Sequence, residues 1–168
     1  MVRVPIYALA RSEPDDRTYV EAEWRALLCS LLSALRGRVL DAPHPHSLVG
    51  RWRSPPEWLV LAHNAGLSAA RWEWNDGDDA PGPSVDLEGD GVRLLVIGDD
   101  VVPLEPESVV PAEIAAACRR LATLAGTSVL EVRLADSGSL TFVSANQLPD
   151  LREGGDHVVA AFVRMLES

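Results

Sequence analysis

The sequence predicts a mixed α/β fold in which an N-terminal β-α-β-α-β lobe is joined to a C-terminal lobe of antiparallel hairpins packed with two helices. In the first half, short apolar runs alternate with stretches whose apolar residues recur at helical spacing. In the second half, strand-like runs follow one another in pairs joined by short polar turns. An acidic segment rich in glycine and proline separates the two halves, and such a composition cannot bury apolar surface.

The N-terminal lobe is expected over residues 1–75, and its first strand over residues 2–10 (VRVPIYALA). Thr18 and Glu21 have the spacing of a capping box, which predicts the start of a helix that ends at Gly37. The apolar positions of this helix repeat at helical spacing and are Trp24, Leu27, Leu28, Leu31, Leu32 and Leu35.

The lobe is expected to continue with a short strand over residues 38–41 and a second helix. Ser54 is a favourable N-cap, Pro55 suits the first helical position, and Glu57 stands three residues after the cap. A strand over residues 67–74 then closes this half.

Residues 76–91 form the acidic segment, which we interpret as a solvated linker or loop. The C-terminal lobe is expected over residues 92–168. Its elements are a hairpin over 92–105, a helix over 111–124, a second hairpin over 128–146 and a last helix over 156–166.

Composition excludes several classes of function. The 168 residues are enough for one domain or two small lobes, and the net charge of −10 argues against binding a phosphate backbone. No apolar stretch approaches the roughly 18 residues that span a bilayer, and the first residues lack a signal-peptide pattern, so we expect a cytoplasmic protein. All 15 basic residues are arginine, which excludes a Schiff base or a lysine general base.

The order of motifs in the second half resembles the C-terminal part of the ATP-grasp ligases. A strand with Arg93 runs into a turn at Gly98, the helical stretch CRRLATLAG follows over 118–126, and two strands end in SANQLPD, similar to a Glu-x-Asn-Pro-x-Pro motif. Residues 47–70 resemble the α/β lobe that precedes the grasp in many of these ligases.

The resemblance implies a truncated and degenerate relative. The central nucleotide-binding subdomain of the family should lie between Trp74 and Val92, where only the acidic segment stands. In the family, two acids and an Asn hold the magnesium ions that bridge the ATP phosphates. The matching positions here are Arg133, Ser144 and Asn146, so the resemblance implies no metal, no cofactor and no ATP-dependent ligation.

Strand alternation predicts which residues share a face of the sheet. Glu131 and Arg133 project together, opposite to the helix-facing Leu130, Val132 and Leu134. On the next strand, alternation groups Phe142 with Ser144 and Asn146.

The predicted ligand-binding residues on one concave face are Arg93, Glu131, Arg133, Ser144 and Asn146, with Trp52 and Trp72 as further lining residues. Two arginines with amide and hydroxyl neighbours would hold a carboxylate or phosphate without metal. The alternative is a solvated face with an ordinary Arg–Glu ion pair.

Two hypotheses about function follow. The first is a non-catalytic protein that binds a carboxylate-bearing small molecule, a peptide or a partner protein without ATP, and that assembles as a homodimer. The second is an ATP-independent cyclase, isomerase or hydrolase of a specialised metabolic pathway. Its acid or base would come from Asp41, His44, His46 or Glu131.

Overall fold

The computed structural model describes the following residues: 16–35, 41, 43, 50–69, 72–73, 82–83, 91–105, 107–136 and 138–167. Residue contacts divide the chain into two units, Met1–Trp52 and Arg53–Ser168. The division therefore falls before the second predicted helix, whereas the sequence predicts a lobe that ends at residue 75. The predicted strand over 2–10 lies outside the described residues, as does the one over 38–41 except for Asp41, which stands in a bend.

The first unit contains helix α2 (Arg17–Ala34). The capping box predicted at Thr18 is wrong, because the helix has already begun at Arg17 and Thr18 lies in its first turn. Asp16 is the N-cap, has a helical backbone and makes no side-chain cap. No residue of α2 is fully buried, so Trp24 is only half-buried. Among the described helices, none is long and apolar enough to cross a bilayer.

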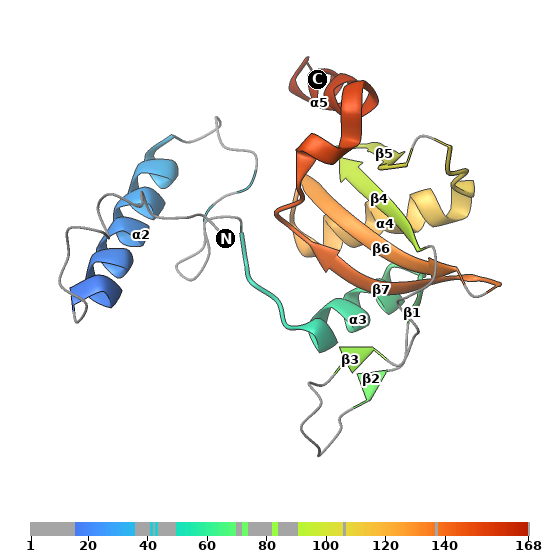
Figure 1. Ribbon diagram of the computed structural model, residues 1–168, viewed down its shortest axis with the longest axis horizontal. Helices are drawn as coiled ribbons and strands as arrows, with labels where there is room; N and C mark the ends of the chain where they lie inside the picture. The colour runs from blue at the N-terminus through green and yellow to red at the C-terminus, as the bar shows by residue number, and fades with distance from the viewer. Residues whose placement is uncertain are drawn as a thin grey trace. The chain divides into compact units, whose positions relative to one another are not determined.

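The second unit is built on a five-stranded mixed sheet, shown in Figure 1. Its strands, in spatial order, are β1 (Ser68–Ala69), β7 (Leu140–Asn146), β6 (Val129–Asp136), β4 (Val92–Ile97) and β5 (Asp100–Pro103). Strand β1 is parallel to β7, and the other neighbours are antiparallel. Both hairpins predicted for the C-terminal half are confirmed, since β4 pairs with β5 and β6 with β7.

Within the strand predicted over 67–74, the described residues form two elements. The first is β1, which joins the main sheet, and the second is β2 (Trp72–Glu73), which pairs antiparallel with β3 (Gly82–Pro83). Part of the segment predicted as a linker is therefore a strand. The parallel pairing of β1 with β7 also places the end of the predicted N-terminal lobe in the same sheet as the C-terminal hairpins.

One face of the sheet packs against helices α3 (Pro55–Asn64) and α4 (Ala112–Ala125). The predicted cap of α3 is confirmed, because the Ser54 backbone N–H donates to Glu57 Oε2 at 2.8 Å. The core on this side contains Trp58, Ala62, Leu94, Val96, Cys118, Leu121, Leu130, Val132, Leu134 and Phe142. Figure 1 shows α4 behind the strands.

The opposite face is partly covered by the C-terminal helix α5 (Gly155–Glu167), which the short 3-10 helix η2 (Leu151–Gly154) precedes. The core beneath α5 contains Leu95, Ile97, Leu104, Val129, Val158 and Ala161. These strand residues lie where β4 ends and β6 begins, so α5 covers one end of the face.

A β-bulge on β7 corrects the predicted alternation. Arg133 pairs with Ser144, but the next residue of β6, Leu134, pairs with Phe142, so Val143 has no partner. Phe142 consequently lies in the core with α3 and α4 and is 0% exposed, rather than on the face that it was predicted to share with Ser144. Phe142 and its neighbour Val143 are both buried at the bulge.

Candidate ligand-binding site

The sheet register brings five of the predicted site residues together on the face that α5 leaves open. Across the β4–β6 pair, Arg93 stands directly opposite Arg133, and across the β6–β7 pair Arg133 stands opposite Ser144. Two pairs further along the strands, Glu131 stands opposite Asn146. We call this group, Arg93, Glu131, Arg133, Ser144 and Asn146, the polar face.

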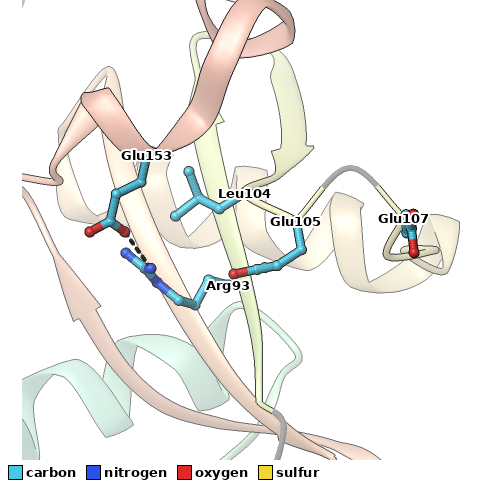
Figure 2. Close-up of a pocket in the computed structure, with 5 residues that line it drawn as sticks. All are labelled: Arg93, Leu104, Glu105, Glu107 and Glu153. Atoms are coloured by element: carbon cyan, nitrogen blue, oxygen red, sulfur yellow. Dashed lines mark hydrogen bonds and ion pairs between the residues drawn. The ribbon is translucent and has the colours of Figure 1, made fainter.

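Arg93 is held by two carboxylates from different parts of the chain. Its Nε donates to Glu131 Oε1 at 3.0 Å, and its Nη1 donates to Glu153 Oε2 at 2.5 Å. Figure 2 shows the Glu153 side chain reaching from η2 to the Arg93 guanidinium. The hydrogen bond with Glu153, and then the one with Glu131, raise the pKa of Arg93 above its usual value. The Arg93–Glu131 ion pair anticipated as the alternative is therefore present.

Glu131 is the buried anchor of this network. Its side chain is only 7% exposed, and Asn146 Nδ2 donates to its second oxygen at 3.4 Å. The same amide also donates to the Leu148 carbonyl at 3.0 Å, so Asn146 joins the end of β7 to Glu131. A buried carboxylate that accepts hydrogen bonds from a charged donor and an amide donor fixes the orientation of its arginine.

Arg133 differs from Arg93 because its side chain has no partner in the described part of the chain. It is exposed, and no hydrogen bond or ion pair joins it to any residue that the structure describes. Like charges directly opposite one another on a sheet repel, so the two glutamates on Arg93 reduce a repulsion that the sequence builds into this pair. The prediction that both arginines together bind an anion stays a prediction; in the described part of the chain, Arg93 already has two carboxylate partners and Arg133 has none.

A hollow of about 450 Å³ lies beside the polar face and is lined by Arg93, Leu104, Glu105, Glu107 and Glu153 (Figure 2). Arg93 is the one cation among these lining residues, against three carboxylates. The hollow therefore carries a negative charge in spite of the arginine at its wall.

The other predicted site residues lie outside the described residues or belong to the first unit. His44 and His46 lie outside the described residues, as does the Trp72 side chain. Asp41 and Trp52 belong to the first unit, where Trp52 is 66% exposed. Among the described residues, no three His, Cys, Asp or Glu side chains come together as a metal site would require.

Glu153 is the residue of the site that the sequence did not reveal. It stands 60 positions after Arg93, in the stretch LREGGD, which has no strand or helix periodicity. The two glycines that follow indicate only a break before α5. No local signal indicates which cation a carboxylate in such a segment contacts.

Comparison with known proteins relates the fold to one group of enzymes. No protein-family model matches the sequence, and no curated protein matches it significantly. Among solved structures, a RiPP-associated ATP-grasp ligase of Chryseobacterium gregarium, in complex with ADP and a leader and core peptide, is 12% identical with a TM-score of 0.64. That alignment covers 96% of this chain and 73% of the ligase.

Two further structures agree with it. The ATP-grasp ligase PsnB, complexed with a phosphomimetic variant of a minimal precursor, Mg and ADP, is 17% identical with a TM-score of 0.59 over 92% of this chain and 75% of that one. The macrocyclase MdnB of Microcystis aeruginosa MRC is 12% identical with a TM-score of 0.55, over 67% of this chain. This chain spans about half of MdnB, 53% of its length. At these identities the comparisons show a shared fold, which is that of part of the ATP-grasp ligases.

Proposed function

We propose that this protein is a non-catalytic, truncated relative of the ATP-grasp ligases that binds a carboxylate-bearing peptide on its polar face without ATP. The fold supports the choice of a peptide over a small molecule, because two of the similar structures were determined with precursor or leader and core peptides. Truncation is supported by the short acidic segment over 76–91, where the family has its central subdomain.

The observation that carries the proposal is the state of Arg133. It is an exposed cation without a partner among the described residues, directly opposite the hydroxyl of Ser144. A planar guanidinium binds a carboxylate through two parallel hydrogen bonds, and a neighbouring hydroxyl can donate a third. An anion at this position would also relieve the repulsion between Arg133 and Arg93.

The same positions argue against nucleotide chemistry. The resemblance assigns Arg133 and Ser144 to two magnesium-binding acids, and a guanidinium repels a divalent cation at that place. The chain has no lysine with which to hold phosphates. We therefore expect that the protein neither binds nor hydrolyses Mg-ATP.

The second hypothesis, an ATP-independent enzyme, has less support. Of its candidate acids and bases, Glu131 is occupied by Arg93 and Asn146. Both of its carboxylate oxygens already accept hydrogen bonds, so a substrate group would have to displace Arg93 or Asn146 to reach them. Asp41 belongs to the first unit, and no observation favours it as a catalytic group.

The test compares the binding of two fluorescent hexapeptides, measured by fluorescence anisotropy at low and at physiological salt. One peptide alternates glycine with glutamate, and the other alternates glycine with glutamine. We expect the glutamate peptide to bind and the glutamine peptide to bind much more weakly. Arg133→Gln should weaken binding about tenfold, the loss of about one charge-assisted contact. Arg152→Gln is the matched control, because Arg152 is exposed and pairs locally with Asp150.

The carboxylate site and the absence of nucleotide binding each have a result that would overturn them. Equal binding of the two peptides, or equal effects of Arg133→Gln and Arg152→Gln, would remove the polar face as a carboxylate site. Calorimetry with ATP and magnesium tests the nucleotide arm, and micromolar binding or phosphate release above that of a denatured sample would contradict the non-catalytic assignment.

A further inference from the structure

We infer that Glu153 is an internal carboxylate ligand of Arg93, and that the carboxylate of a bound peptide displaces it, so that the Glu153 side chain regulates access to the polar face. The inference rests on the proposed function, because it assumes that a peptide carboxylate reaches this face. The Arg93–Glu153 ion pair is then an autoinhibitory contact, which the peptide must break in order to bind.

The two carboxylates on Arg93 are not equivalent. Glu131 lies on a central strand, is 7% exposed and accepts hydrogen bonds from both Arg93 and Asn146. Removing one partner of such a buried pair leaves an uncompensated charge, which proteins tolerate poorly. Glu131 therefore stays in place and keeps the Arg93 guanidinium oriented.

Glu153 is bound much less firmly. Its side chain is 49% exposed, and the only ion pair that it makes with a described residue is the one to Arg93 Nη1, at 2.5 Å. Exposed ion pairs of this kind contribute little to stability, because water solvates both partners when they separate. A ligand carboxylate can therefore replace Glu153 at a small cost in free energy.

The backbone around Glu153 allows the side chain to leave without unfolding the segment. Gly154 is buried, and a Cβ there would overlap the Val158 side chain, so η2 packs closely on the first turn of α5. Gly155 has a φ of +60°, which a residue with a side chain rarely adopts. With the main chain held in this way, displacement needs only a rotation of the Glu153 side chain into solvent.

The negative charge of the hollow favours a ligand carboxylate that replaces Glu153 over one that binds in addition to it. A further carboxylate beside Glu105, Glu107 and Glu153 would be repelled. If Glu153 turns outward as the ligand arrives, the number of carboxylates on Arg93 remains two. Because Arg93 and Arg133 are directly opposite each other, an incoming carboxylate that replaces Glu153 also lies beside the uncompensated Arg133.

The experiment compares Glu153→Gln with Glu105→Gln, using the fluorescent glutamate hexapeptide. Both variants remove one negative charge from the same hollow, but only Glu153 has an ion pair with Arg93. We expect Glu153→Gln to bind the peptide about fivefold more tightly than the unmodified protein, and Glu105→Gln to change affinity by less than about twofold. Thermal unfolding of both variants confirms that they are folded.

A second measurement follows the displaced side chain directly. The carboxyl-carbon NMR resonance of Glu153, assigned by its loss in Glu153→Gln, should move on saturation with the peptide, while that of Glu131 stays in place. Equal affinities of the two variants, or an unmoved Glu153 resonance in a protein that binds the peptide, would overturn the inference and leave the proposed function intact. Failure of the peptide to bind either the unmodified protein or Glu153→Gln would overturn both, and binding to Glu153→Gln alone would support the inference in its strongest form.

Discussion

Replacing Phe142 by alanine tests the β-bulge that arranges the polar face. Phe142 is fully buried and packs with α3 and α4 only because Val143 is unpaired. Burying an aromatic side chain removes about 150–250 Å² of its surface from contact with water. At about 25 cal/mol per Å², this corresponds to a hydrophobic free energy of about 4–6 kcal/mol. Alanine retains part of this burial, so Phe142→Ala should lower the free energy of unfolding by about 3–5 kcal/mol.

The measurement is urea unfolding followed by circular dichroism, with Ser144→Ala as the control. Ser144 is on the opposite face and makes no described contact that alanine would lose, so this variant should change stability by less than about 0.5 kcal/mol. If Phe142→Ala leaves too little folded protein, Phe142→Leu should still cost about 1 kcal/mol or more.

The refuting result follows from the same geometry. Without a bulge, Phe142 would share the polar face with Ser144 and would face solvent. Similar small losses for Phe142→Ala and Ser144→Ala would therefore show that the strand is regular. The register that places Ser144 opposite Arg133 would then be wrong, and the polar face would have to be redrawn.

Four further predictions concern the rest of the molecule. Burial raises the pKa of the Cys118 thiol to about 12, so this cysteine should resist maleimide at pH 8 until the protein unfolds, and rapid labelling of native protein would contradict its burial. Gly154→Ala should destabilise the protein by about 1–3 kcal/mol in urea, because its Cβ would overlap Val158, and no change would show that η2 is not held there. Ser54→Ala should cost about 0.5–2 kcal/mol through loss of the helix cap, whereas Thr18→Ala, inside the first turn of α2, should cost almost nothing. We also expect a homodimer, since α5 exposes several large apolar side chains, and light scattering that shows a monomer at high concentration would count against it.

Local sequence signals account for the elements that were predicted well. The cap of α3 depends on Ser54, Pro55 and Glu57, which lie within four consecutive residues and act on one another whatever the rest of the chain does. The C-terminal hairpins depend on turns between neighbouring strands, so their partners are also close in sequence. Thr18 shows the limit of such signals. It has the spacing of a cap, but the helix begins one residue earlier, at Arg17, with Asp16 as its N-cap.

The composition of the polar face was also predictable, but its state of charge was not. Alternation along β6 correctly separated Glu131 and Arg133 from the core residues between and beside them. It did not show that Arg93 has two carboxylate partners while Arg133 has none among the described residues. The second partner of Arg93 depends on where η2 places Glu153, and no local signal in the sequence indicates that position.

By itself, the sequence determined the helices, the two C-terminal hairpins and the set of residue types on the polar face, because these depend on neighbours within a few positions. Only the tertiary structure decided the bulge at Val143, the pairing of β1 with β7 and the contact of Glu153 with Arg93. Each of these features depends on packing between elements that are far apart in the sequence. Burial of Phe142 stabilises the bulge more than regular alternation would stabilise a continuous strand. The segment before α5, the helix that covers one end of the sheet, brings Glu153 to Arg93. No short stretch of sequence specifies either of these features.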